Sequence, residues 1–315
     1  MGYSARYHAA SLAAVFIALA VGILIGAEFG GDLVRNTRAS LERSLTGNLQ
    51  DARDRADELA GRLGAAREFE ARAYPALVDG RLEGQRVGAL ALGGLPDSTY
   101  AAIEETLRPT GAGLVAVGVV REPPDLESLA GALSNTRFAD VARNPETVQA
   151  LGVGIGRQVV LGGTLLDRVA GRFFSRASGR FEGLDGVIVV RSQPERMTAA
   201  ERTATSRLEV GLLDGITATR TVAVGVEETS TEISSVSFFD SQDISSADSL
   251  DLVAGRVATV FSLLGAKGSF GTKGSADRFL PDILAPAPRP PLRVEREGGE
   301  GGTPRQQPTG RGAGG

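Results

Sequence analysis

The chain opens with a long apolar segment that differs from everything after it. Residues 9–27 form an uninterrupted apolar run without a charged side chain. As a helix, this run would be about 28 Å long, close to the thickness of the hydrocarbon core of a bilayer. Tyr3 and Tyr7 before the run and Phe29 after it match the aromatic belts of membrane interfaces. The pattern predicts a membrane helix, and we assign residues 1–30 to an uncleaved anchor.

A cleaved secretory signal is the alternative interpretation of this segment. Such a signal has a basic amino-terminal region, an apolar core of about 7–15 residues and a cleavage site flanked by small residues. Here Arg6 and the amino terminus are the basic groups, the apolar run is longer, and the nearest cleavage site would place Ile25 and Ala27 at its key positions. These features favour the anchor.

The charges beside the anchor leave its orientation open. Arg6 precedes the apolar run, whereas Arg35, Arg38 and Arg43 follow it. The positive-inside rule alone would weakly favour a cytoplasmic position for the rest of the chain. Acidic residues that begin with Glu42 blunt this rule.

Small residues recur at every fourth position of the anchor. Such residues line one helix face and let a second backbone approach closely, which drives helix pairing in lipid. A helix rich in alanine and glycine can also show such a strip by chance. The candidate packing residues are Ala10, Ala14, Ala18, Gly22, Gly26 and Gly30.

Residues 31–79 carry a second helical pattern. Apolar residues alternate between spacings of four and three, the a/d pattern of a coiled coil, and charges of both signs lie between them. Gly47, Gly61 and Gly64 each cost about 1 kcal/mol relative to alanine, so this coil needs neighbours. A single amphipathic helix lying on the following domain is the alternative. Pro75 and Gly80 are expected to close the segment. The predicted seam comprises Leu45, Leu49, Ala52, Ala56, Leu59, Leu63 and Ala66.

From residue 80 onward, short apolar runs alternate with helical patterns. This alternation predicts a mostly parallel α/β sheet covered on both faces, which we assign to residues 80–285. Residues 286–315 are rich in proline and glycine and are expected to be disordered. The strand candidates are residues 86–92, 113–120, 186–191 and 221–226. The helical candidates are residues 97–107, 125–133, 145–151, 158–169, 198–213 and 249–264.

Composition excludes several classes of chemistry. The net charge of -4 gives no electrostatic basis for binding nucleic acid. There is no cysteine, so a disulfide framework, a zinc knuckle and a thiol nucleophile are all excluded. The one histidine is His8, at the membrane boundary, so a Ser–His pair cannot form in the soluble domain. We therefore predict no catalytic residue, no metal site and no cofactor.

Three local patterns have a mainly structural interpretation. Gly93 and Gly94 follow a predicted strand, but the three-glycine phosphate fingerprint is absent, which favours a turn leading to a helix capped by Asp97. A second glycine cluster has no strand leading into it: Gly152, Gly154 and Gly156. An acidic stretch could hold a hard cation such as Ca²⁺ or supply paired carboxylates, although helix capping near residue 249 also explains it: Asp240, Asp243, Asp248 and Asp251.

Two blocks resemble the actinobacterial copper-transport protein family called MctB. The first is SLAAVFIALAVGILIGAEF at residues 11–29, followed by the coil-like helix. The second is LVAGRVATVFSLLGAKGSFGTKGSADRFLP at residues 252–281, with Lys273-Gly274 where the family pattern leads us to expect Pro-Gly. The resemblance covers both ends of residues 1–285. It implies a single-pass membrane protein of the cell envelope, with its large domain outside the cytoplasm, that serves copper export or copper homeostasis.

The residues support only part of what this resemblance implies. Copper(I) prefers cysteine and methionine sulfur and copper(II) prefers imidazole, but the soluble domain offers Met197 alone. One hypothesis is therefore a non-catalytic component of copper transport or homeostasis. The other is an envelope or cell-division scaffold that does not bind copper directly. In both cases we expect a homodimer formed through the anchor and the coil, and the scaffold hypothesis adds another envelope protein as a partner.

Overall fold

The first element is one long helix. The computed structural model describes residues 4–194 and 196–282, with helix side chains described for 7–27 and 40–78. Helix α1 (Ser4–Val78) has 75 residues and runs without a break through the predicted anchor and the predicted coil. At about 1.5 Å per residue, α1 is about 110 Å long. The chain divides into two compact units, residues 1–72 and 73–315, so the last turn of α1 belongs to the second unit.

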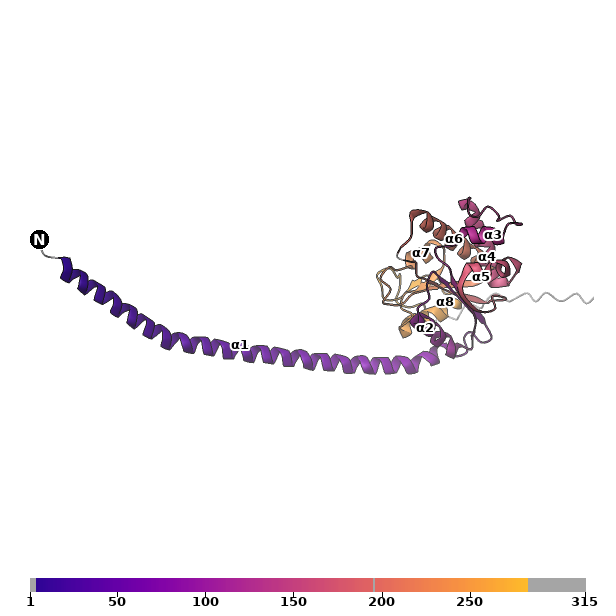
Figure 1. The fold of residues 1–315 in the computed structure, drawn as a ribbon. Helices are drawn as coiled ribbons and strands as arrows, with labels where there is room; N and C mark the ends of the chain where they lie inside the picture. Colours follow the sequence, from indigo (N-terminus) through magenta and orange to yellow (C-terminus); the bar gives the residue numbers. More distant parts are fainter. Residues whose placement is uncertain (1–3, 195, 283–315) are drawn as a thin grey trace, which may run out of the picture. The chain divides into compact units, whose positions relative to one another are not determined.

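The second unit contains the predicted α/β domain (Figure 1). A seven-stranded sheet has the order β3-β2-β1-β4-β5-β6-β7, and all neighbouring pairs are parallel except β2 with β3. The predicted fold class is thus confirmed. The predicted disordered tail lies outside the described residues. The strands are β1 (Arg86–Leu92), β2 (Gly113–Val120), β3 (Phe174–Gly179), β4 (Gly186–Arg191), β5 (Val222–Val226), β6 (Ser245–Ala247) and β7 (Ser269–Phe270).

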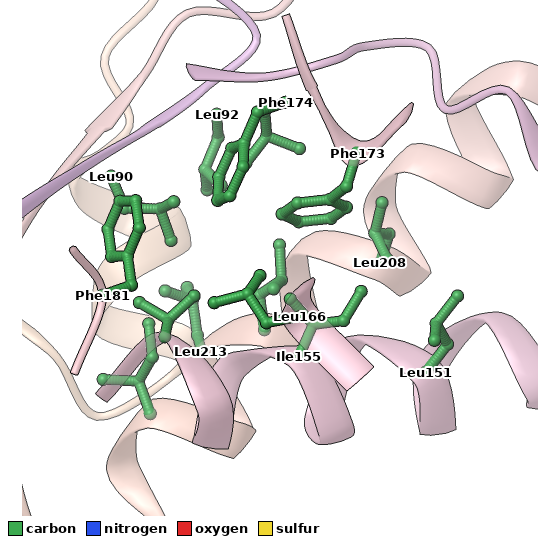
Figure 2. Close-up of a cluster of buried hydrophobic side chains, with 14 of the residues drawn as sticks. Leu90, Leu92, Leu151, Ile155, Leu166, Phe173, Phe174, Phe181, Leu208 and Leu213 are labelled. Carbon is green, nitrogen blue, oxygen red and sulfur yellow. The ribbon is translucent and has the colours of Figure 1, made fainter. Parts of the chain in front are cut away.

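Side chains alternate along the strands and build one core on each face of the sheet. Leu90 and Leu92 of β1 enter the larger core, shown in Figure 2, whereas Ala89 and Ala91 enter the other. The larger core is covered by α3 (Leu126–Ala132), α4 (Pro145–Leu161), α5 (Thr164–Phe173), α6 (Ala199–Thr217) and α7 (Val236–Ser241). The opposite core is covered by α2 (Asp97–Leu107), α8 (Val253–Leu263) and the end of α1, and η1 (Arg108–Thr110) follows α2.

Tyr74 ties the last turn of α1 into the domain. Its side chain is 5% exposed and packs in the core beneath α2 and α8. Its hydroxyl donates a hydrogen bond of 2.6 Å to the carbonyl of Thr106 in α2. Val78, one turn later, is fully buried in the same core. Pro75 lies inside the helix, which ends at Val78, two residues before Gly80.

The break predicted between the helices at residues 145–151 and 158–169 is misplaced: α4 continues to Leu161, and the break before α5 lies at Gly162 and Gly163. The glycine cluster lies inside α4, where it lets α4 and α6 approach closely. A Cβ on Gly156 would lie 2.1 Å from the carbonyl oxygen of Leu212 and 3.1 Å from the Cα of Gly215. Gly152 and Gly211 face each other in the same way, with a built Cβ on either lying 3.0–3.1 Å from the other Cα. The absence of side chains at these glycines therefore lets the two helices cross in close contact.

Most of the remaining differences lie in segments without a long apolar run. Strands β3, β6 and β7 were not predicted, because none has a long apolar run. Ser245 and Ser246 of β6 are nevertheless buried, because β5 and β7 pair with that strand on either side. Helix α8 begins at Val253, four residues later than predicted.

Candidate functional site: a cleft at the switch point of the sheet

The connections that leave β1 and β4 diverge at the carboxyl edge of the sheet. The chain passes from β1 to α2 on one face and from β4 to α6 on the other. Open parallel sheets bind ligands in the crevice that such a divergence creates. A cleft of about 400 Å³ opens at this point. Its lining includes Pro96, Thr99, Val190, Arg191, Ser192, Gln193, Pro194, Met197, Arg202, Glu227, Glu228, Thr231, Ile233 and Ser235.

The turn after β1 forms one wall of the switch point. Gly93 has a φ of 89°, and a Cβ on it would lie 2.2 Å from the carbonyl oxygen of Ser192, which follows β4. Close approach of the two loops therefore requires glycine at this position. The predicted turn is confirmed, but Asp97 is the first residue of α2 rather than its cap, because the N-cap is Pro96 and makes no side-chain capping bond.

A buried ion pair lies at the end of β4. Arg191 donates from Nε to Oε1 of Glu209 at 2.9 Å and from Nη2 to Oε2 at 3.0 Å. The Glu209 side chain is 1% exposed, and Gln193 donates a further bond of 3.0 Å to its Oε2. The guanidinium also lies 4.1 Å from the ring centroid of Phe238. These contacts hold Arg191 in one orientation between the core and the cleft.

A second carboxyl group, Glu122, lies beside this pair without a hydrogen-bond partner in the described residues. Both of its carboxyl oxygens are buried. Burial, repulsion by Glu209 and opposing attraction by Arg191 together raise the pKa of Glu122 to about 8. Burial also raises the pKa of Glu209, but the two bonds from Arg191 oppose that shift. Glu122 is therefore the carboxyl group that holds a proton at neutral pH.

Lys273 connects the carboxyl ends of β5 and β6. Its ammonium donates to Oε1 of Glu227 at 2.7 Å and to the backbone carbonyls of Glu228 and Thr231, both at 3.0 Å. Its backbone N–H donates to Oδ2 of the fully buried Asp248 at 2.9 Å. Lys273 is the position that departs from the expected Pro-Gly, and here it compensates the buried charge of Glu227.

The four aspartates of the acidic stretch are not gathered into one site. Asp248 binds the 271–273 loop, whereas Asp251 accepts from the N–H and the hydroxyl of Thr229. Asp240 lies in α7, and Asp243 occupies a left-handed turn with φ of 54°. None of them caps α8, whose N-cap is Leu252 and makes no side-chain capping bond. Among the described residues, no three His, Asp or Glu side chains are grouped to hold a metal ion.

The residues predicted to pack in the anchor and in the coil all lie in α1. Residues Tyr7–Ala27 have a mean hydropathy of 2.5 and are long and apolar enough to cross a membrane. No atom within 4 Å would meet a Cβ on Gly22 or Gly26. Ala10, Ala14 and Ala18 are exposed in the same stretch, and of Gly30 only the helical backbone is described. The seam leucines are 51–64% exposed: Leu45, Leu49, Leu59 and Leu63. The seam alanines, Ala52, Ala56 and Ala66, are exposed as well.

The charged residues of the switch point were not predicted from the sequence. Arg191 ends an apolar strand, Glu227 follows the next one directly, and Glu122 comes two residues after β2. Charged residues at the carboxyl ends of parallel strands indicate a ligand site, so these residues could have been identified from the sequence. Glu209 could also have been identified, because it is a carboxylate next to Leu208, a buried residue on the apolar face of α6.

The comparison with known proteins covers almost the whole described chain. The family model "Copper transport outer membrane protein, MctB" matches residues 3–281. Relatives named copper transporter MctB occur in Mycobacterium bovis (strain ATCC BAA-935 / AF2122/97) and in Mycobacterium tuberculosis strains CDC 1551 / Oshkosh and ATCC 25618 / H37Rv. Each is 32% identical over 113 residues, which is 36% of this chain and 36% of the relative. The aligned part thus spans about a third of these relatives, and the family model extends the match to both ends of the fold. This chain belongs to the MctB family.

Proposed function

We propose that this chain is a single-pass, membrane-anchored protein of the cell envelope that serves copper homeostasis without catalysing a reaction. The observation that carries the proposal is the family match over residues 3–281, which includes the candidate membrane span Tyr7–Ala27. The family is described as a copper transport protein of the outer membrane, and the relatives are named copper transporters. The large domain lies outside the cytoplasm in this proposal.

The chemistry of the side chains favours an indirect role in copper handling. Tight copper sites combine several soft sulfur or imidazole ligands. The chain has no cysteine, and its one histidine, His8, lies in the candidate span. Met197 lines the switch-point cleft, where its sulfur lies 3.7 Å from the hydroxyl of Thr205. A single thioether beside a hydroxyl is a poor copper site, so the chain would act through a partner.

This ligand inventory also favours a second candidate function, an envelope or cell-division scaffold. A scaffold needs exposed surfaces rather than soft ligands. Helix α1 supplies such a surface, because its seam leucines are exposed on the isolated helix. The scaffold would bind an envelope protein through α1 and the α/β domain.

Self-association through α1 is part of both functions. The small-residue strip would let two helices approach closely in lipid, and the seam would continue the interface outside it. A dimer would cover the leucines at residues 45, 49, 59 and 63, which are half or more exposed in one chain. The competing arrangement, in which a single helix lies on the domain, would leave a monomer.

Cell-associated copper tests the proposed function. We would delete the gene in its host and restore either the full chain or a form whose residues 1–27 are replaced by a cleavable signal peptide. Copper measured by mass spectrometry should change on deletion and return to normal only with the anchored chain. Unchanged copper after deletion, with altered cell separation or envelope permeability, would support the scaffold and refute the copper role.

Protease accessibility tests the proposed topology. The intact mass of the purified protein should include the first 27 residues, because the apolar core is long and its cleavage site is poor. Protease added to whole cells with a permeable outer layer should cleave the large domain. A mature amino terminus near residue 28, or a fully protected domain, would contradict the single-pass topology.

A further inference from the structure

Three donor side chains around the switch-point cleft make their hydrogen bonds to other groups of the protein. Arg191 gives two of its N–H bonds to Glu209, and the hydroxyl of Thr99 donates to Oε1 of Glu228 at 2.7 Å. The ammonium of Lys273 donates to three acceptors of the cleft lining: the Glu227 carboxylate, the Glu228 carbonyl and the Thr231 carbonyl. An anion entering the cleft would therefore compete with bonds that the protein already makes.

Two acceptor groups of the same cleft could accept further hydrogen bonds. Within the described residues, the carboxylate of Glu228, which lines the cleft, accepts one hydrogen bond, at Oε1, and its Oε2 has no described donor. Gln193 donates its amide to Glu209 and leaves its own oxygen without a described donor. A ligand with hydrogen-bond donors would bond to these oxygens, and a positively charged donor would also compensate the charge of Glu228.

Part of the remaining lining is apolar. Met197 lies in the wall, and Ile233, from the loop after β5, is 86% exposed at the cleft. Val190 and two prolines, Pro96 and Pro194, extend this surface. Apolar walls with a few placed polar groups, in a cleft of about 400 Å³, are typical of small-molecule sites. Arg202 is exposed and donates to the carbonyl of Met197, so a cation is also present in the lining.

We propose that the switch-point cleft binds a small organic ammonium compound. Its charged head would lie on the open oxygen of Glu228, with Gln193 as a second acceptor. Its apolar part would lie against Met197 and Ile233. This site is separate from self-association through α1, and it does not depend on the copper role: the two arguments share only Met197, which serves here as an apolar contact and not as a metal ligand.

Methionine methyl resonances provide a direct readout of this site. The chain has two methionines, Met1 and Met197, so methyl-¹³C labelling gives two signals, and Met197→Leu identifies the one in the cleft. The full chain in lipid nanodiscs would be titrated with butylammonium, butanol and butyrate, which share an alkyl chain and differ in the head group. We expect a saturable shift of the Met197 signal with butylammonium, at least fivefold tighter than with butanol, and no saturable shift with butyrate.

A matched pair of variants tests the role of the carboxylate. Glu228→Gln keeps an acceptor for Thr99 but removes the charge, so the preference of butylammonium over butanol should fall to about one. Glu127→Gln, an exposed position in α3, should keep the preference. The Met197 signal of each free variant shows whether the cleft has kept its structure. Equal binding of the three probes, tighter binding of butyrate, no saturable shift with any probe, or an unchanged preference in Glu228→Gln would overturn the proposal. None of these results bears on cell copper.

Discussion

The carboxyl group of Glu122 lies against the backbone of Gly93: a Cβ on Gly93 would lie 2.9 Å from Oε2 of Glu122. This contact places an unpaired, buried carboxyl group beneath the turn that forms one wall of the switch point. The neighbouring charges, Arg191 and Glu209, already satisfy each other through two hydrogen bonds. Glu122 is therefore the member of the cluster whose charge state responds to pH.

Stability should fall as pH rises from about 5 to about 8. In the unfolded chain, Glu122 loses its proton near its ordinary pKa of 4.5, whereas in the folded chain its pKa is raised to about 8. The folded state therefore holds more protons in this window, and stability decreases with pH by up to about 1.4 kcal/mol per unit. Denaturant unfolding at several pH values measures this slope.

The variant Glu122→Gln isolates this contribution. Because glutamine does not titrate, the variant should lose most of the slope between about pH 5 and pH 8 and should be more stable than the wild type at pH 8. Glu182→Gln, at a largely exposed position, should keep the slope. A slope that is the same in Glu122→Gln and in the wild type would show that Glu122 titrates normally.

Glu209→Gln should destabilise the α/β domain strongly. It removes the charge that compensates Arg191, whose side chain is 17% exposed, and breaking a buried pair of this kind costs about 3 kcal/mol. The same change at Glu182, which pairs with Arg180 at 3.6 Å and is 57% exposed, should stay within about 0.5 kcal/mol. Chemical denaturation of the two variants gives the comparison. Similar losses at both positions would mean that the Arg191–Glu209 pair contributes no more than a surface contact.

The sequence predicted those elements whose pattern is local. The strands at residues 86–92, 113–120 and 186–191 have the predicted bounds because each is a continuous run of apolar residues. Strand β6 could not be found in this way, since Ser245 and Ser246 owe their burial to neighbours distant in the sequence. The helix break predicted around the glycines of α4 was misplaced for the same reason, because their role depends on α6. The cluster of Glu122, Arg191 and Glu209 likewise comes from three separate segments.

The glycines at the crossing of α4 and α6 should not tolerate alanine. Gly156→Ala would place a methyl group 2.1 Å from the carbonyl oxygen of Leu212, so the helices would have to separate, at a cost of about 3 kcal/mol. Gly171→Ala, in α5, has open space around its Cβ and should stabilise the fold by up to about 1 kcal/mol. Thermal unfolding of both variants checks the contrast. A neutral Gly156→Ala would contradict the close crossing.

Self-association should depend on both parts of α1. Replacing Gly22 and Gly26 with leucine should weaken it by preventing close approach of two backbones. Replacing Leu59 and Leu63 with aspartate should weaken it outside the lipid, because each change buries a charge in the seam. Arg53→Asp, on the charged face between seam positions, is the control and should have little effect. Crosslinking in native membranes measures the outcome, and a monomeric wild type would rule out the interface.

A copper(I) titration of the purified full chain tests the central claim most directly. The claim is that this MctB-family protein serves copper homeostasis without a tight copper site of its own, since Met197 is the one soft ligand in residues 73–282. In competition with a chelator of nanomolar affinity, we predict no stoichiometric copper on the protein. Saturable one-to-one binding that survives this competitor and is lost in Met197→Leu would contradict the account and establish direct copper handling.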